Sequence, residues 1–216
     1  MEVLERIGCL GVLPMATFDD PTTGPAVANA LKAGGLPVVE VTFRTTAAVP
    51  AIQLIRNAVP DVLVGAGTVL DAKMARDALD AGAQFVVCPG LHRDVVEICL
   101  TEGVPVVPGA LTSTELAKAL QYGLAVVKVF PAERFGGTAL LKDLSGPFPT
   151  LRFVPSGGVN ATNMASYLSL PFVHALSGSW VIARVSTAKG DPREITQRAR
   201  EAVDAVSRAR GATDNA

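Results

Sequence analysis

The sequence has no uninterrupted apolar run approaching the roughly 20 residues that a membrane-spanning helix needs. Its beginning carries Glu2 and Glu5 where a secretory signal would be basic, and Pro14 interrupts the apolar stretch that follows. Net charge is almost absent too, because 19 basic and 20 acidic residues leave −1 at pH 7. Without a basic surface, we expect neither nucleic acid nor an anionic membrane as a partner.

Metal ligands and paired thiols are scarce. The two histidines are His92 and His174, and no short-spaced cluster of His, Asp and Glu appears, so we predict no metal site and no cofactor. The three cysteines, Cys9, Cys88 and Cys99, are odd in number and follow no metal-binding or redox spacing. Since no secretory signal accompanies them, they indicate reduced thiols in a cytoplasmic protein.

What the sequence does contain is typical of an α/β enzyme. Of its 216 residues, 49% are hydrophobic, 18% are charged and 20 are glycines, which fits one domain with a large core. Short, mostly Val-rich runs bounded by Gly or Pro predict strands. These runs are Gly11–Thr17, Leu36–Thr42, Val62–Ala66, Gln84–Cys88, Val104–Val107, Ala125–Phe130, Arg152–Pro155 and Val173–Ser177.

Segments with helical periodicity separate the predicted strands. Asp71–Ala81 and Thr112–Gly123 each begin at a residue that can cap a helix and end at or just before a glycine. A last amphipathic helix is predicted over about Arg193–Arg210, followed by a frayed tail at Gly211–Ala216. Strands alternating with helices predict a single (β/α)8 TIM barrel over residues 1–216.

Two ionisable residues lie inside apolar predicted strands. Lys128 interrupts Val126–Phe130, and Glu40 lies on one strand face with Val38 and Thr42. A buried lysine is either paired with a carboxylate or held as an uncharged amine, which is a nucleophile toward carbonyls. A structural ion pair, or a lysine reaching water at the strand end, is the alternative interpretation. Two such residues on separate strands favour a functional site.

Further candidates follow the predicted strands, because the catalytic side chains of such barrels lie at the carboxyl ends of the strands. Ser156–Gly158 and Ser177–Ser179 end the last two strands, where glycine-containing turns can bind phosphate through main-chain N–H groups or can simply turn the chain. Arg44 can pair with a substrate carboxylate or remain solvated. Gly67 and Thr68 form a small-residue loop that can approach a ligand or only turn.

Three other residues are assigned no chemistry. His92 is predicted to open a helix, either exposed or capping, and His174 is predicted to pack within a strand. Cys88 ends a predicted strand and is a candidate for lining a pocket, without acting as a nucleophile.

In combination, these motifs resemble those of the class I 2-keto-3-deoxy-6-phosphogluconate (KDPG) aldolases, a family that also includes 4-hydroxy-2-oxoglutarate (KHG) aldolases. The matching segments run in family order over about residues 8–208. They are VVEVTFRT (Val38–Thr45), VGAGTVL (Val64–Leu70), GAQFVVCPG (Gly82–Gly90), VPVVPGALTSTE (Val104–Glu115), VKVFPAE (Val127–Glu133), GPFP (Gly146–Pro149), FVPSGGV (Phe153–Val159) and SGSW (Ser177–Trp180).

The resemblance implies roles for individual residues. The Schiff-base lysine of the family falls on Lys128 and its general acid/base on Glu40, with substrate-carboxylate contacts on Arg44 and Thr68 and the Pro89 backbone nearby. The phosphate end of the substrate site falls on Ser156, Gly157, Gly158, Gly178 and Ser179. The resemblance also implies a homotrimer of TIM barrels that needs no metal.

Three departures from the family pattern stand out. Ser156 replaces the usual threonine before the Gly-Gly pair, and Ser177 occupies a position that is usually glycine, with His174 three residues upstream. Met15-Ala16-Thr17 replaces a more aliphatic first strand, so the floor of the barrel or the lining of the pocket is expected to differ.

The implied reaction is the cleavage of KDPG to pyruvate and glyceraldehyde 3-phosphate through a Schiff base, as in Entner–Doudoroff metabolism. The galactonate-derived C4 epimer and unphosphorylated 4-hydroxy-2-oxoglutarate are alternative substrates. A phosphosugar epimerase or isomerase, or a non-catalytic phosphate-binding barrel, would use the same fold. Lys128 within the sixth predicted strand argues against an epimerase, and the missing ligand cluster disfavours a metal-dependent aldolase.

Overall fold

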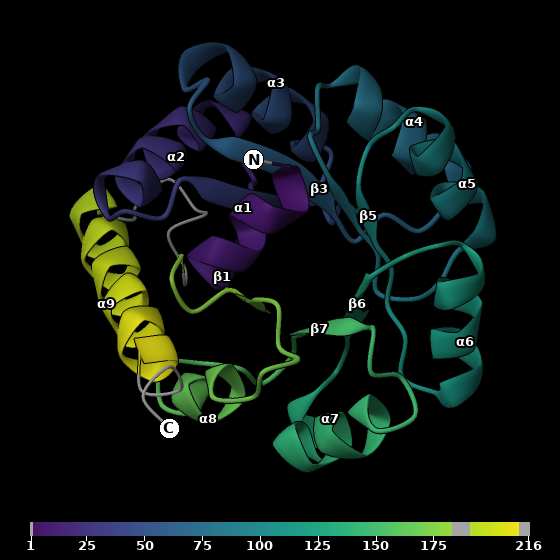
Figure 1. The fold of residues 1–216 in the computed structure, drawn as a ribbon. Coiled ribbons are helices and arrows are strands. Elements are labelled where there is room, and N and C mark those ends of the chain that lie inside the picture. The colour runs from purple at the N-terminus through teal and green to yellow at the C-terminus, as the bar shows by residue number, and fades with distance from the viewer. Residues whose placement is uncertain (1, 183–190, 212–216) are drawn as a thin grey trace.

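A computed structural model describes residues 2–182 and 191–211 of the chain. Parallel strands lie at the centre and helices surround them, as Figure 1 shows. Within the described ranges, every one of the eight predicted strands is present and in the predicted order. The strands are β1 (Val12–Ala16), β2 (Val38–Thr42), β3 (Leu63–Gly67), β4 (Val86–Val87), β5 (Val106–Val107), β6 (Val126–Val129), β7 (Arg152–Pro155) and β8 (Leu176–Gly178).

A helix separates each strand from the next, and a further helix precedes β1. The helices are α1 (Val3–Leu10), α2 (Gly24–Ala33), α3 (Ala48–Ala58), α4 (Ala72–Asp80), α5 (Arg93–Thr101), α6 (Ser113–Gln121), α7 (Gly137–Ser145), α8 (Met164–Leu168) and α9 (Pro192–Gly211), with short 3-10 turns η1 (Pro21–Thr23) and η2 (Glu133–Phe135). None of these described helices is both long and apolar enough to cross a membrane.

The predicted helix caps are confirmed. Asp71 Oδ1 accepts a hydrogen bond of 2.8 Å from the Met74 N–H, and Thr112 and Glu115 form a reciprocal capping box. The tail prediction is wrong at Gly211, which belongs to α9, and its other residues, 212–216, lie outside the described part of the chain. The helix extends this far because its apolar face stays packed, with Val206 buried in the last turns.

The strands form a six-stranded sheet in the order β5-β4-β3-β2-β1-β8 and a two-stranded sheet, β6-β7, and every pair is parallel. Isolated parallel bridges link the two sheets at both edges. One joins Gly109, just after β5, to Lys128, and two others, Phe153 with Val173 and Ser156 with Ser177, join β7 to the β8 segment. The α/β class is confirmed, and the closed eight-stranded barrel stays a prediction.

The amino-terminal ends of the strands are covered by α1, which crosses the middle of the view in Figure 1. His174 lies just before β8, so its predicted place within a strand is wrong, although it is packed as expected. Its Nε2 donates to the Leu4 carbonyl at 2.8 Å, which ties the segment before β8 to α1. Val173 pairs only with Phe153, and the ladder with β1 starts at Leu176, which explains the shorter strand.

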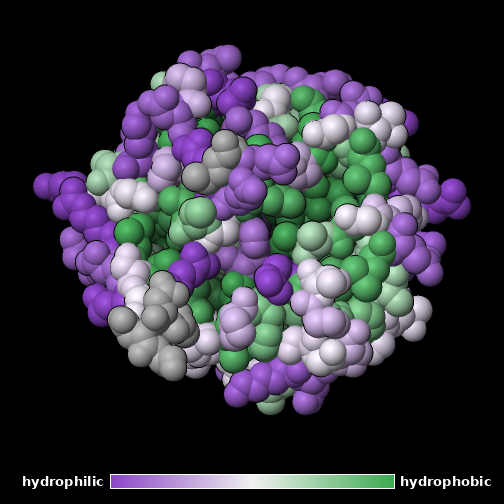
Figure 2. All heavy atoms as spheres, viewed as in Figure 1, coloured by the Kyte–Doolittle hydropathy of each residue, from purple (hydrophilic) through white to green (hydrophobic). Residues whose placement is uncertain are grey.

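The distribution of polar residues on the surface follows from the arrangement of helices around the strands. Figure 2 shows hydrophilic residues along the outer rim of the molecule, over the exposed faces of the helices, and apolar residues between and inside them. His92 is the residue that precedes α5, as predicted, but its side chain is half-buried and makes no capping hydrogen bond. The prediction that it caps the helix or lies exposed is therefore wrong.

Candidate active site

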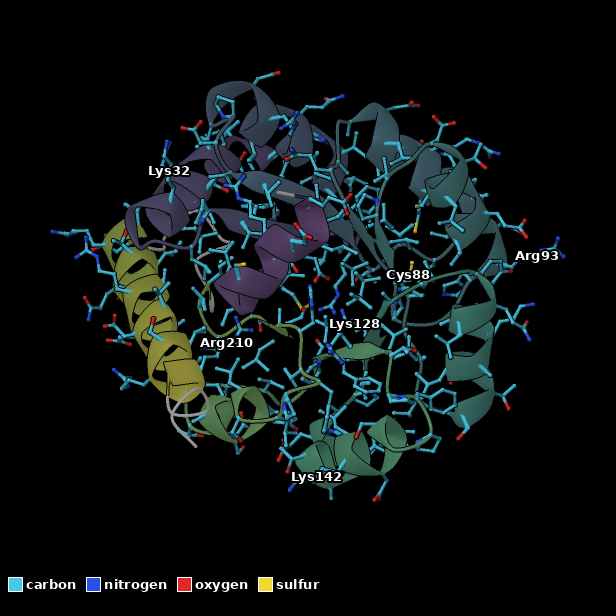
Figure 3. The ribbon with its side chains drawn as sticks, viewed as in Figure 1. Lys32, Cys88, Arg93, Lys128, Lys142 and Arg210 are labelled. Carbon is cyan, nitrogen blue, oxygen red and sulfur yellow. The ribbon has the colours of Figure 1, made fainter. Side chains whose placement is uncertain are left out.

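Lys128 and Glu40 meet in the interior from opposite parts of the fold, β6 and β2. Their side chains are 4% and 0% exposed, and Lys128 Nζ lies 3.5 Å from Glu40 Oε1. In Figure 3, Lys128 lies inside the ring of helices, whereas the labelled lysines Lys32 and Lys142 lie on its outer side. An amine and a carboxylate at this separation, with this little water around them, attract strongly, because a low-dielectric interior screens charge poorly.

The two oxygens of Glu40 have different surroundings. Oε2 accepts a hydrogen bond of 3.1 Å from the Ser177 hydroxyl on β8. Oε1 is buried and has no hydrogen-bond partner among the described residues, so its contact with Lys128 is one of charge alone. A buried acceptor without a partner is costly in a folded protein, and such atoms are found at sites that perform chemistry.

Gly67 at the end of β3 makes room for Glu40. A Cβ atom at Gly67 would collide with the carboxylate and would lie 2.5 Å from Glu40 Cγ, so any larger residue would displace Glu40. The next residue, Thr68, has a φ of +59°, a left-handed conformation that is uncommon for residues other than glycine. Such strain, about 1–3 kcal/mol, persists where the surrounding structure demands it and is concentrated at functional sites.

A pocket of about 400 Å³ opens beside the pair. It brings together six residues predicted from the sequence, namely Arg44, Ser156, Gly157, Gly158, Gly178 and Ser179. Met15, Thr17, Phe130, Val159 and Ile182 complete its lining. Lys128 is not part of this lining, but its Nζ lies 5.8 Å from the ring centroid of Phe130, which is.

Thr68 and Pro89 do not line this pocket. They adjoin the pair instead: Thr68 follows Gly67, and the Pro89 carbonyl packs against Gly109, which bridges to Lys128. Arg44 is exposed, and it lies with the glycine turns rather than with Thr68. The predicted site thus divides into an inner part around Glu40 and Lys128 and an outer pocket.

The glycine turn after β7 is held by residues that sequence reasoning missed. Gly157 and Gly158 have φ values of +84° and +88°, which a side chain would strain. The Gly158 carbonyl accepts hydrogen bonds of 3.0 Å from the side-chain amides of both Asn160 and Asn163, and the Gly157 carbonyl accepts one of 3.1 Å from the Glu133 N–H. Asn160 and Asn163, which follow the Gly-Gly pair within five residues, are the signal that could have identified this support.

Cys88 is fully buried and is not part of the pocket lining, so the prediction that it lines the pocket is wrong. Burial raises the pKa of its thiol to about 12, with a smaller contribution from Cys99. The thiol is therefore protonated at neutral pH and inert as a nucleophile, as expected. Within residues 2–182 and 191–211, no group of three or more His, Cys, Asp and Glu side chains is placed to hold a metal ion.

Known proteins match the sequence of this chain over most of its length. Residues 3–199 match the family model of the KDPG and KHG aldolases. A 2-dehydro-3-deoxy-phosphogluconate aldolase of Treponema pallidum (strain Nichols) is 44% identical over 205 residues, which cover 95% of this chain and 96% of that protein. A KHG/KDPG aldolase of Escherichia coli (strain K12) is 41% identical over 197 residues, which cover 85% and 92% of the two chains.

Among solved structures, KDPG aldolases are also similar to this chain. The KDPG aldolase of Legionella pneumophila, with pyruvate captured as a covalent carbinolamine, superposes with a TM-score of 0.87 at 35% identity, covering 91% of this chain and 96% of that one. The enzyme of Zymomonas mobilis ZM4, solved with 3-phosphoglycerate, gives a TM-score of 0.86 at 38% identity, covering 93% and 94%. From the extent of these matches, the chain belongs to the family of KDPG and KHG aldolases.

Proposed function

We propose that this protein is a class I aldolase in which Lys128 forms the Schiff base with a 2-keto acid and Glu40 moves the protons. The substrate proposed is KDPG, cleaved to pyruvate and glyceraldehyde 3-phosphate. The observation that carries the proposal is the buried pair itself, with Lys128 Nζ and Glu40 Oε1 3.5 Å apart next to a pocket. A nucleophile and a base within reach of the same atom are what Schiff-base chemistry requires. The captured carbinolamine in the Legionella pneumophila relative supports the same kind of chemistry here.

The steps follow from these two groups. The neutral Lys128 amine attacks the C2 carbonyl carbon, and Glu40 supplies and removes protons while water leaves and the protonated Schiff base forms. Glu40, directly or through water, then takes the proton of the C4 hydroxyl. The C3–C4 bonding electrons flow into the Schiff base, so the aldehyde leaves and an enamine remains. Protonation of the enamine at C3 and hydrolysis release pyruvate and restore Lys128.

The outer pocket would hold the rest of the substrate. The glycine turns at Gly157–Gly158 and Gly178–Ser179 would bind the phosphate through main-chain N–H groups, with Ser156 beside them. Arg44 would pair with the substrate carboxylate, and Thr68 and the Pro89 backbone would contact the keto-acid end near Lys128. Apart from Arg44, which lines the outer pocket although its proposed partner is the carboxylate of the keto acid, the division into an inner and an outer part matches a substrate with its keto acid at one end and its phosphate at the other.

We further propose that the chain forms one domain with a closed (β/α)8 barrel, because the bridges at Gly109–Lys128 and Ser156–Ser177 link the two sheets at both edges. The family resemblance supports a homotrimer, to be tested by sedimentation. The three free cysteines and the resemblance to a metabolic aldolase support a cytoplasmic location and an Entner–Doudoroff role.

The substrate is tested by a panel of three 2-keto acids. Purified protein is incubated with KDPG, its C4 epimer derived from galactonate, or 4-hydroxy-2-oxoglutarate, and pyruvate release is measured. The highest kcat/KM is expected for KDPG. A higher value for either of the others would replace the substrate but keep the chemistry. Epimerised sugar phosphate without pyruvate, or binding without turnover, would favour the non-aldolase alternatives.

The role of Glu40 is tested separately. Glu40→Gln keeps the shape of the side chain but removes its basicity, so kcat should fall by about 10²–10⁴-fold. Pyruvate release is again the measurement, with circular dichroism to confirm folding. A folded Glu40→Gln variant with the wild-type kcat would show that another group moves the protons.

A further inference from the structure

We infer that Ser177 is a positioning residue for Glu40: its hydroxyl holds Oε2 and thereby keeps Oε1 directed at Lys128. The inference rests on the proposed role of Glu40 as the general acid/base. It assigns a task to a buried serine that has no role in the proposed function.

The hydrogen bond from Ser177 to Glu40 lies in the buried interior of the molecule. Both residues are 0% exposed, and the bond joins strands whose residues are 137 positions apart in the sequence. The bond is 3.1 Å long, which is longer than is usual between two oxygens, but a hydroxyl that donates to a carboxylate forms a charge-assisted bond, and such a bond is stronger than a neutral one of the same geometry. In a low-dielectric interior such a bond has little competition from water, so it fixes the orientation of the carboxylate.

The sheet fixes the Ser177 hydroxyl in turn. On one side, Ser177 pairs in register with Leu13 of β1, and on the other it bridges to Ser156 at the end of β7. Its backbone is thus held by neighbours on both sides. A donor on such a rigid element positions its partner more accurately than a donor on a loop.

Gly67 limits Glu40 from another direction. The carboxylate packs so closely on Gly67 that even a Cβ atom there would collide with it. The carboxylate is therefore confined by the backbone of β3 and anchored by the hydroxyl from β8. The remaining oxygen, Oε1, has no hydrogen-bond partner among the described residues and lies 3.5 Å from Lys128 Nζ, where the carbinolamine would form.

A comparison with Ser156 shows that this arrangement is specific to one serine. The two serines are bridge partners on adjacent segments, and both are buried. The Ser156 hydroxyl, however, points to Met15 Sδ at 3.8 Å, a weak acceptor, and it borders the outer pocket. Only the Ser177 hydroxyl reaches Glu40 among the hydrogen bonds of the described residues.

The test is a double-mutant cycle on the purified enzyme with KDPG as substrate. It compares wild type, Ser177→Ala, Glu40→Gln and the double variant by kcat, KM and thermal stability. The yield of pyruvate trapped on Lys128 by borohydride is measured in parallel. Thr196→Val is the matched control, because it removes a hydroxyl that donates to the Ala30 carbonyl at 3.0 Å on the outside of the fold.

If Ser177 positions Glu40, Ser177→Ala should lower kcat about 10-fold, a part of the 10²–10⁴ that a general acid/base contributes. KM should stay within about twofold and the final adduct yield should not change, because binding and the amine are intact. In the Glu40→Gln background the same substitution should have no further effect on kcat, since the base that Ser177 positions is gone, even though the amide oxygen of Gln can still accept the hydroxyl. Thr196→Val should keep the wild-type kcat.

Other results would overturn the inference. An unchanged kcat in folded Ser177→Ala, or an equal loss of kcat in both backgrounds, would leave Ser177 a merely structural serine while the proposed function stands. A wild-type kcat in Glu40→Gln would remove the proposed role of Glu40 and the Ser177 inference with it. If Ser177→Ala does not fold, Ser177→Cys tests the same point, because a thiol is similar in size but a weak donor.

Discussion

At the amino-terminal ends of the strands, polar side chains are bonded to main-chain carbonyls, whereas at the carboxyl-terminal ends a buried carboxylate oxygen is left without such a partner. His174 donates to Leu4, and Arg210 donates to the carbonyls of Gly8 at 2.6 Å and His174 at 3.0 Å. At the other end, Glu40 Oε1 has no hydrogen bond within the described ranges and faces Lys128.

This difference in hydrogen bonding means that one end of the strands serves the stability of the fold and the other serves its reactivity. His174 and Arg210 use their donors in hydrogen bonds that hold α1 and α9 to the rest of the fold, so these donors do not bind a substrate. An acceptor left open costs stability, and it can take and return a proton when a substrate arrives. Substitutions at the carboxyl end should therefore change activity first, and those at the amino end should change stability first.

Removing the amine should have the largest effect. Lys128→Ala should abolish pyruvate release from KDPG, because it removes the amine that forms the covalent intermediate. Exposed Lys142 on α7 provides the control, since Lys142→Ala should keep the wild-type kcat. Near-normal activity of Lys128→Ala without an added amine would rule out the Schiff base.

Filling the space beside Glu40 should be the next most severe change. In Gly67→Ala the new methyl group collides with the carboxylate, so kcat should fall by about 10²-fold, as misplacement of a catalytic group by about 1 Å can cause. Steady-state kinetics and thermal unfolding measure the result. Gly146→Ala is the control, because a Cβ atom at Gly146 would come no closer than 3.8 Å to a neighbour. An active Gly67→Ala enzyme would mean that Glu40 can work from another position.

A substitution at the amino-terminal ends of the strands should lower stability and leave kcat nearly unchanged. Arg210→Ala removes the hydrogen bonds to Gly8 and His174 and should lower the free energy of unfolding by about 1–3 kcal/mol. The value of kcat at a temperature where the protein stays folded should remain within about twofold of wild type. Urea unfolding checks the first expectation, with exposed Arg208→Ala as control. A loss of kcat without a loss of stability would contradict the separation of the two ends.

The smallest expected effect depends on pH. Burial lowers the pKa of His174 below its ordinary 6.5, and the positive charges of Arg210 and Arg152 add to this against the opposing bond to Leu4. The unfolded state therefore binds more protons below about pH 6.5, so His174 contributes stability above that pH and loses it as the pH falls toward its folded pKa. Between pH 7.5 and pH 5.5, Tm should fall less in His174→Gln than in wild type. Equal slopes would show that other groups dominate.

The sequence was sufficient to predict the strands, two helix caps and the inner pair, because each depends on a local pattern. A lysine or a glutamate inside a Val-rich run is recognisable without knowing the neighbouring strands. The carboxyl-end rule for parallel strands then indicated that both belong to one site. The position of β8 was missed because the chain before Leu176 makes only one bridge to β7, which no local pattern reveals.

Contacts between distant strands were beyond the reach of the sequence. The bond from Ser177 to Glu40 depends on the register of β8 and β2 against β1, and no spacing rule brings residues 137 positions apart together. Val159 and Ile182 line the pocket as ordinary apolar residues, without a signal that marks them. The structure thus brings the predicted residues Glu40 and Lys128 together, whereas the prediction of the pocket lining was incomplete.

The central claim is that Lys128 is the nucleophile, and the most direct test is to capture its adduct. The protein is incubated with pyruvate, reduced with borohydride, weighed intact by mass spectrometry and mapped by peptides. The account predicts one stable pyruvyl-derived adduct on Lys128, absent when pyruvate is omitted and absent in Lys128→Ala. No adduct on folded wild-type protein, or an adduct on another lysine, would contradict it.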